Sequence, residues 1–370
     1  MKIVLFCHSL LSDWNHGNAH FLRGIIAELL DRDHDVTVYE PVDGWSRANL
    51  VAEHGAGAVD EVQAAFPGLH SSTFDPRQRD LAAMTEGAEL VVVHEWNDPE
   101  LVAELGSRRA GGGYRLLFHD THHRAVSKPE EMARYDLTHY DGVLAFGRVI
   151  RDIYLDRGWA ERAWTWHEAA DTRTFHPIDG VENRGDLVWI GNWGDGERSA
   201  ELQEFLIGPV ERLAIRADVH GVRYPDVAKR ALADAGIRYR GWLANHRVPA
   251  AFAAHRVTVH IPRRPYVDAL PGIPTIRPFE AMACGIPLVC APWDDVEGLF
   301  SPGEDYLVAA DGAEMARHID DVLNDPELAA SLGEHGRRTI LDGHTCAHRV
   351  DELLDVCAEI GLAREPVGHG

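Results

Sequence analysis

The stretch 271–290, PGIPTIRPFEAMACGIPLVC, decides the local fold of the second half of this 370-residue chain. Pro278 suits the first turn of a helix, Gly285 suits the position just past its end, and Pro287 forbids its continuation. An apolar run typical of a strand follows directly. The pattern therefore predicts a short helix with Glu280 in its first turn, where free N–H groups and the helix dipole favour a carboxylate.

Short apolar runs alternate with helical patterns along the whole chain. In the first half the runs are 3–7, 36–39, 90–93, 116–118 and 143–146, and in the second half they are 187–190, 218–220, 238–241, 257–261, 288–290 and 306–308. Helical patterns such as 200–213 and 227–235 separate them. Such alternation is typical of buried parallel strands and predicts an α/β protein of two doubly wound parallel-sheet domains with a ligand cleft between them.

The sequence Glu-Ala-Met-Ala-Cys-Gly at 280–285 resembles the donor-site signature of GT-B retaining glycosyltransferases of the family-4 type. In that family the acid corresponding to Glu280 grips both ribose hydroxyls of a nucleotide sugar. A second acid usually stands eight positions earlier, where this chain has Gly272. That departure resembles the branch that includes the spore-coat-maturation glycosyltransferases.

The resemblance also implies a domain organisation. The segment 168–177 resembles the interdomain sequence of the family, which places a Rossmann-like acceptor-binding domain at 1–177 and a Rossmann-like nucleotide-sugar-binding domain at 178–345. In this architecture the last helix, here within 346–370, commonly packs back on the first domain.

Ligands of open parallel sheets bind beyond the carboxyl ends of the strands, so residues that follow each run are candidates. Glycines after the strand 187–190 would let backbone N–H groups approach a phosphate, and arginines would grip it. The predicted donor-binding residues are Glu280, Gly191, Asn192, Trp242, Leu243, Arg263, Gly272, Ile273, Thr275 and Arg277. Arg198, at the start of the next helix, is predicted to support the leaving diphosphate as a catalytic residue.

In the first half, titratable residues crowd the loops after the strands. His119 matches the histidine that faces the donor sugar in the family, and it is predicted to be catalytic together with Asp120. The predicted acceptor-binding residues are Asp13, His16, Gly17, Asn18, Glu95 and His122. A metal site built from His119, Asp120, His122 and His123 is the rival interpretation of this cluster.

Composition limits the function classes. The formal net charge of −23 argues against nonspecific binding to nucleic acid or anionic membranes. Five cysteines without Cys-x-x-Cys spacing favour a reducing cytoplasm, the run 1–7 is too short for a signal peptide, and no window approaches a membrane span.

The sequence therefore predicts a cytoplasmic glycosyltransferase that moves a sugar from a nucleotide-diphosphate sugar to an acceptor. The resemblance implies retention of stereochemistry without a metal or cofactor. Three alternatives remain at this point: a nucleotide-sugar epimerase of the same fold, a noncatalytic sugar-nucleotide sensor and a metal-dependent hydrolase. The donor base, the acceptor and the oligomeric state are open.

Overall fold

The computed structural model describes residues 1–182 and 184–362, which form two compact units. The first unit comprises residues 1–13, 21–168 and 346–362, and the second comprises residues 14–20, 169–182 and 184–345. Residues 169–177 group with the second unit, whereas the predicted first domain extended to residue 177. The remainder of the predicted C-terminal segment, residues 363–370, lies outside the described residues.

The first unit is built on a parallel sheet in the order β3-β2-β1-β4-β5-β6-β7. The strands are β1 Lys2–Phe6, β2 Asp35–Pro41, β3 Ser72–Phe74, β4 Leu90–His94, β5 Arg115–Asp120, β6 Gly142–Ala145 and β7 Ala163–Thr165. β4 is buried along its whole length, as its unbroken apolar run requires. The strand order reverses between β1 and β4, which makes their carboxyl ends the switch point of this sheet.

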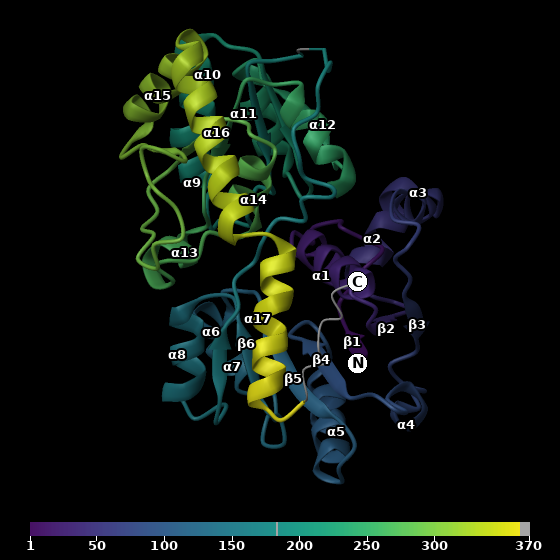
Figure 1. Cartoon of the computed structure of the whole chain (residues 1–370). Coiled ribbons are helices and arrows are strands. Elements are labelled where there is room, and N and C mark those ends of the chain that lie inside the picture. The colour runs from purple at the N-terminus through teal and green to yellow at the C-terminus, as the bar shows by residue number, and fades with distance from the viewer. Residues whose placement is uncertain (183, 363–370) are drawn as a thin grey trace. The chain divides into compact units, whose positions relative to one another are not determined.

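Helices surround the first sheet (Figure 1). They are α1 Ala19–Asp31, α2 Trp45–His54, α3 Gly57–Ala65, α4 Leu81–Met84, α5 Pro99–Ala110, α6 Arg124–Ser127, α7 Pro129–Met132, α8 Arg148–Asp156 and α17 Cys346–Glu359. Asp98 caps α5 by accepting a hydrogen bond from the amide of Glu100, and Pro99 occupies the first helical position.

The C-terminal helix α17 belongs to the first unit. Arg32, directly after α1, donates to Asp351 at 2.6 Å, and the indole N–H groups of Trp164 and Trp166 donate to Glu359 and to the carbonyl oxygen of Arg349, both at 2.8 Å. These contacts hold α17, drawn in yellow in Figure 1, against α1 and the segment that contains β7.

The second unit has a parallel sheet in the order β10-β9-β8-β11-β12-β13. The strands are β8 Leu187–Ile190, β9 Ala217–His220, β10 Arg238–Gly241, β11 Val257–His260, β12 Leu288–Cys290 and β13 Leu307–Val308. Here the switch point lies between the carboxyl ends of β8 and β11.

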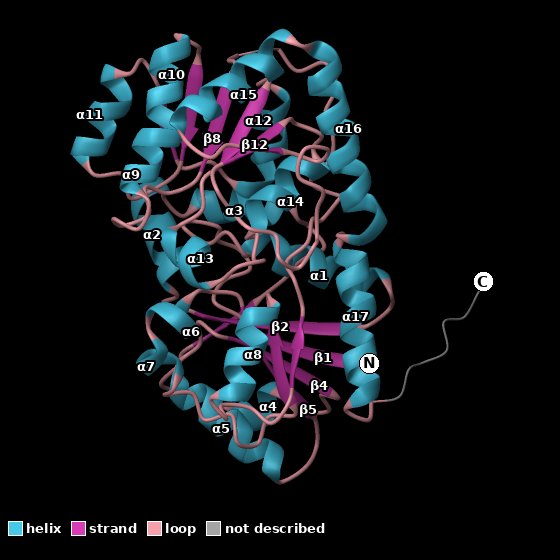
Figure 2. Cartoon of the chain, turned by 90° about the vertical axis from the view of Figure 1, so that its left-hand side faces the viewer, coloured by secondary structure: helices cyan, strands magenta, loops and turns pink. Residues whose placement is uncertain are grey.

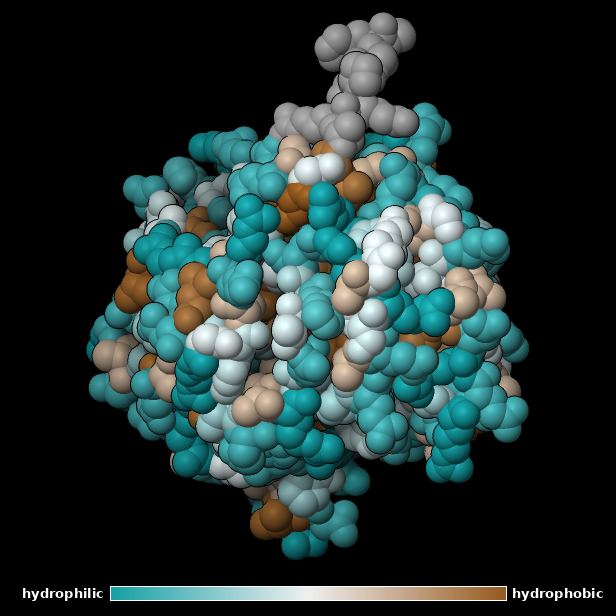
Figure 3. Space-filling model, turned by 90° about the horizontal axis from the view of Figure 1, so that it is seen from below, coloured by the Kyte–Doolittle hydropathy of each residue, from teal (hydrophilic) through white to brown (hydrophobic). Residues whose placement is uncertain are grey.

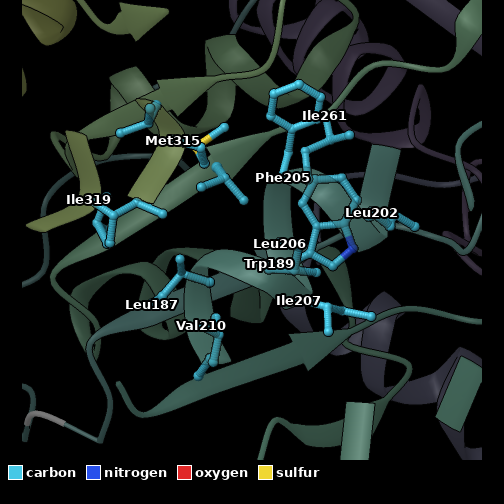
Figure 4. Close-up of a cluster of buried hydrophobic side chains, with 14 of the residues drawn as sticks. Leu187, Trp189, Leu202, Phe205, Leu206, Ile207, Val210, Ile261, Met315 and Ile319 are labelled. Carbon is cyan, nitrogen blue, oxygen red and sulfur yellow. The ribbon is translucent and has the colours of Figure 1, made fainter. Parts of the chain in front are cut away.

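Helices flank this sheet on both faces (Figure 2). They are α9 Ser199–Leu202, the π-helix Gln203–Ile207, α10 Gly208–Leu213, α11 Asp226–Asp234, the 3₁₀-helix Asn245–Arg247, α12 Val248–Ala253, α13 Arg264–Ala269, α14 Ile276–Ala283, α15 Gly312–Asn324 and α16 Pro326–Gly343. Trp189 of β8 and Phe205 of the π-helix lie in a buried apolar cluster with Met315 of α15 (Figure 4). The prediction of two doubly wound parallel-sheet α/β units is confirmed.

On the face shown in Figure 3, hydrophilic residues predominate and apolar residues lie in small groups. Within the described residues, no helix combines the length and the apolar character that a membrane span requires.

Candidate active site

The loop that precedes α14 has an unusual backbone. Gly272 has φ +88°, and Thr275, the residue before the helix, has φ +58°, which a β-branched side chain rarely adopts. A Cβ on Gly272 would lie 2.6 Å from Cγ of Glu297, so only glycine fits there. Two residues with positive φ in one short loop cost free energy, which indicates that this backbone conformation has a functional role.

The start of α14 corrects one sequence prediction. The helix begins at Ile276 rather than at Pro278, so Glu280 lies in the second turn and its carboxylate does not cap free N–H groups. The predicted stabilisation of Glu280 by the helix dipole was therefore wrong.

Glu280 is instead fully buried among polar side chains of the second unit. Its Oε1 accepts hydrogen bonds from Nδ1 of His20 at 2.8 Å and from the side-chain amide of Asn245 at 3.0 Å, and its Oε2 accepts from Arg277. Burial alone would raise the pKa of Glu280, but Arg277 and then His20 and Asn245 outweigh burial and lower the pKa below its ordinary value. Glu280 is thus a buried carboxylate in its charged form.

The orientation of His20 follows from its two partners. Nε2 accepts a hydrogen bond from the backbone N–H of Asp171 at 2.7 Å, so the ring proton is on Nδ1, which donates to Glu280. The imidazole stacks on Phe175, with ring centroids 4.0 Å apart. His20 was not predicted, because nothing at the start of α1 indicates a partner 260 positions away. Asn245, also missed, carried a usable signal, because it closely follows β10.

Arg198 lies where the loop after β8 meets α9. Its Nε and Nη2 donate to the carbonyl oxygen of Asn192, and its Nη1 donates to the carbonyl oxygen of Ile261 at 3.1 Å. Within the described chain these hydrogen bonds go to neutral carbonyls and not to a carboxylate. Burial, followed by the positive charge of Arg263, lowers the pKa of Arg198 to about 9. The guanidinium is therefore charged at neutral pH but poorly compensated.

Arg263 and Arg277 both lie close enough to Arg198 to lower its pKa. Arg263 pairs with Glu197 at 2.9 Å, and the charge of Arg277 also lowers the pKa of Arg198. The histidine at the end of β11, His260, has its pKa lowered to about 3 by burial and then by Arg198 and Arg277, so it is neutral. The structure thus brings Arg263 and Arg277 close to Arg198, and Arg198 and Arg277 close to His260, near the switch point of the second sheet.

The other predicted donor residues lie along the same edge. A Cβ on Gly191 would fall 2.6 Å from the ring of Trp189, so the backbone packs directly on that indole. The side chain of Asn192 donates to Asn15, also in the second unit, and accepts from the amide of Val222 at 3.2 Å.

Trp242, Leu243 and Ile273 complete the set of predicted donor residues. Trp242 and Leu243 are partly buried and lead from β10 into the 3₁₀-helix that carries Asn245. Ile273 is buried beside Gly272.

In the first unit, His119 does not face solvent. It is buried on β5 between the rings of Phe21, Trp166 and His94, and burial lowers its pKa to about 3. Asp120 is buried as well; it accepts from the hydroxyl of Tyr154 at 2.8 Å and from the amide of His122 at 3.0 Å. Burial and then the charge of Glu95 raise the pKa of Asp120 well above its ordinary value. In this structure both side chains are enclosed by the first unit, and their predicted catalytic role stays a prediction.

Glu95 forms a buried ion pair with Arg124. Its Oε2 accepts from Nε and Nη2 of Arg124 at 3.1 and 2.7 Å, and its Oε1 accepts from the amide of Thr121 at 3.0 Å. The hydroxyl of Tyr135 donates to the carbonyl oxygen of Glu95. Glu95 was predicted to contact an acceptor, but in this structure both of its carboxylate oxygens accept hydrogen bonds from the protein.

The predicted acceptor loop after β1 is divided between the units. Asp13 belongs to the first unit, where it pairs with the buried Arg23 at 2.9 Å. His16, Gly17 and Asn18 belong to the second unit and are not grouped with the first-unit residues. His122, by contrast, remains in the first unit, with its ring edge-on to Trp96.

The rival metal cluster does not form in the described part of the chain. No three side chains of histidine, cysteine, aspartate or glutamate converge there with the geometry of a metal site. His119 packs among aromatic rings, and Asp120 points toward Tyr154. Nothing in the arrangement favours the hydrolase interpretation.

Residues 198–355 match the family described as "Glycosyl transferase-like". No curated protein matches the chain.

Several solved structures are similar over nearly the whole chain. Sucrose-phosphate synthase from Thermosynechococcus elongatus has a TM-score of 0.67 at 14% identity, covering 97% of this chain and 99% of that one. Anabaena Alr3699/HepE in complex with UDP-glucose has 0.67 at 15%, covering 97% and 100%. A glycosyltransferase from Rickettsia africae has 0.64 at 10%, covering 97% and 98%.

At these identities the structural likeness shows the fold. The predicted resemblance to the GT-B glycosyltransferases is confirmed, while the finer resemblance to the spore-coat branch stays a prediction.

Proposed function

Because residues 198–355 match the glycosyl transferase-like family and the chain has the GT-B fold, we propose that it transfers a sugar from a nucleotide-diphosphate sugar to an acceptor hydroxyl. The donor binds the second unit at the carboxyl ends of β8, β10 and β11. The acceptor binds the first unit. HepE, which shares the fold, was solved in complex with UDP-glucose, and this supports a donor of the same class.

The observation that carries the proposal is the group of Arg198, Arg263 and Arg277, in which Arg198 lies close to the other two guanidinium groups. The guanidinium of Arg198 is partly buried over the ring of Trp189 and its hydrogen bonds go only to carbonyls, so a bound polyanion would add charge-assisted hydrogen bonds. A diphosphate supplies two negative groups whose oxygens match the planar donor geometry of arginine. The shaped loop at Gly272 and Thr275 lies directly before Arg277 and contributes backbone N–H groups.

The role proposed for Glu280 requires one rearrangement. Its carboxylate is buried, and of its three side-chain partners Arg277 is the partly exposed one, at 18% of its side chain. A diphosphate would draw Arg277 away from Glu280 and free Oε2 to accept hydrogen bonds from the ribose diol. His20 and Asn245 would keep Oε1 in place during this exchange.

The proposed reaction leaves the configuration of the sugar unchanged. The acceptor oxygen forms a bond to the anomeric carbon as the bond from that carbon to the β-phosphate oxygen breaks. The acceptor proton passes to an oxygen of the departing phosphate, giving a glycoside and a nucleoside diphosphate. Arg198, Arg263 and Arg277 stabilise the negative charge that grows on the leaving diphosphate.

We also place the enzyme in the cytoplasm. Cys7, Cys284, Cys290, Cys346 and Cys357 are all buried free thiols, as expected in a reducing compartment.

A thermal-shift screen with UDP-, GDP- and dTDP-linked sugars in EDTA tests the proposal. A donor at about 100 times its dissociation constant should stabilise the protein by roughly 2.7 kcal/mol. Slow release of free sugar from the same donor, measured without acceptor, would support a transferase. Isomerisation of the donor sugar would instead indicate an epimerase, and binding without turnover in the presence of cell extract would indicate a sensor. If no nucleotide sugar shifts the melting temperature, the proposal fails.

A further inference from the structure

The first unit exposes two tryptophans at the carboxyl edge of its sheet. Trp45 begins α2 just after β2, and Trp96 follows β4; they are 45% and 41% exposed. Among the described residues, no other tryptophan is more than about a third exposed. Exposing a large indole forfeits much of the free energy that its burial would contribute, so a pair at one edge needs an explanation.

His8 joins the two tryptophans into one aromatic surface. It follows β1, and its ring centroid lies 6.4 Å from that of Trp45 and 6.3 Å from that of Trp96. His122 continues the surface, edge-on to Trp96 at 5.1 Å. We call Trp45, His8, Trp96 and His122 the aromatic platform. His8 and Trp96 follow β1 and β4, the strands at the switch point of the sheet, where ligands of this fold class bind.

Buried charges hold the platform from beneath. The guanidinium of Arg124 lies 4.0 Å from the ring centroid of Trp96, and the buried Glu95 fixes that guanidinium by two hydrogen bonds. Arg124 thus covers one face of the indole, and 41% of Trp96 nevertheless remains exposed. Glu95 is therefore a positioning residue for the platform, not a ligand contact.

Packing and hydrogen bonds also fix the position of Trp45. Gly44, which precedes Trp45, lies so near the carbonyl oxygen of His8 that an added Cβ would be 3.2 Å away. The buried carboxylate of Glu40 accepts from the amide of Leu10 at 2.7 Å and from Arg47 of α2 at 3.1 Å, which ties the loop after His8 to α2. A surface fixed before binding loses little entropy when it orders a ligand.

The chemistry of the platform selects its ligand. Indole faces carry negative charge density and attract the electron-poor C–H groups of a sugar ring, as they attract cations. Neighbouring rings are tilted by 34° and 49° and so form a faceted surface rather than the parallel slot that a flat aromatic molecule prefers. Burial lowers the pKa of His8 to about 4, and the charge of Arg124 is matched by Glu95, so nothing here favours an acidic ligand.

We propose that the aromatic platform binds a neutral saccharide, which is the acceptor of the glycosyl transfer. This inference rests on the proposed function, because it identifies the acceptor class for that reaction. The exposed face of Trp96 stacks on one sugar ring, Trp45 covers an adjoining ring or edge, and hydroxyl groups remain at the rim.

The test uses the full chain with nucleotide diphosphate present. Binding to an array of neutral mono- and oligosaccharides, with the flavonol quercetin as a flat aromatic probe, identifies a ligand for titration calorimetry. Trp96→Ala and Trp45→Ala should each weaken saccharide binding by about tenfold or more, and Trp96→Phe should restore most of it. Trp159→Ala is the matched control, because Trp159 also lies under an arginine but follows α8, away from the platform. It should change binding less than twofold.

Donor binding separates this inference from the proposed function. The thermal shift with nucleotide sugar should be equal in the wild-type protein and both platform variants. If that shift is present but no neutral saccharide binds, if the alanine variants bind saccharide like the wild type, or if quercetin binds in preference to every saccharide, the inference is overturned. A wild-type protein without any donor response would overturn the proposed function and this inference with it.

Discussion

Replacing Arg198 by glutamine should separate donor binding from stability. The guanidinium donates three hydrogen bonds to two carbonyl oxygens and carries a charge that neighbouring arginines oppose. Glutamine keeps a hydrogen-bonding amide of intermediate length but removes the charge. The variant Arg198→Gln therefore tests whether the charge is kept for an anionic ligand.

The two expected effects have opposite signs. Loss of a bidentate, charge-assisted contact with phosphate should cost about 1.5–3 kcal/mol, or roughly a 10- to 150-fold increase in the donor dissociation constant. For the free protein, the difference between the ordinary pKa of 12.5 and about 9 corresponds to at most roughly 5 kcal/mol of destabilisation by the charged form. The hydrogen bonds lost to the carbonyls offset part of that gain. We expect the free variant to be as stable as the wild type or more so.

Calorimetric titration with nucleoside diphosphate and urea unfolding of the free protein measure the two effects. Arg264→Gln is the control, because Arg264 begins α13 at the same edge but its side chain is 52% exposed and pairs with Glu201. It should change donor affinity less than about threefold. A destabilised Arg198→Gln protein that binds donor normally would refute the reasoning, since the guanidinium would then be structural.

Three further outcomes are expected. Donor affinity should fall about tenfold per pH unit as pH rises above about 9, because Arg198 must be protonated to bind a diphosphate; titration between pH 7 and 10.5 checks this, and a flat profile would contradict it. Gly272→Ala should lower the free energy of unfolding by about 1–3 kcal/mol through its positive φ and its overlap with Glu297, whereas Gly298→Ala, with a similar φ and open space, should cost only the backbone part; equal losses in urea unfolding would rule out the overlap. Glu280→Gln should cost about 2–4 kcal/mol at pH 7, because buried donors lose their carboxylate, and the gap to wild type should close as pH falls through the lowered pKa of Glu280; a gap that persists in acid would show that the charge is not responsible.

Most of the fold was predictable because its strands are buried on both faces. A continuous apolar run such as β4 is unambiguous in sequence. β3 and β7 were missed because they are three-residue edge strands with partly exposed side chains, so neither forms a full apolar run. The helix expected at 200–213 is interrupted by the π-helix Gln203–Ile207, which no local pattern indicated.

The candidate site was predictable only where position along a strand determines it. Asn192 and Arg198 follow β8; Asn192 was assigned from that placement, and Arg198 from that placement together with the resemblance, which puts a basic phosphate ligand near this position. His119 was expected to face a ligand because it ends an apolar run, yet the rings of Phe21 and Trp166 cover it. Phe21 and Trp166 are distant from His119 in the sequence, so the local sequence pattern could not predict that they bury it.

The segment 14–20 affects the order in which the second unit can fold during synthesis. This unit consists mainly of residues after 168, yet His20 supplies one of the hydrogen bonds to Glu280. During synthesis the segment leaves the ribosome more than two hundred residues before its carboxylate partner, so this contact closes late. A fragment that starts at residue 169 would keep the contacts of Glu280 with Arg277 and Asn245 but lose the hydrogen bond from His20, and supplying a short peptide with the sequence of 14–20 should restore its stability.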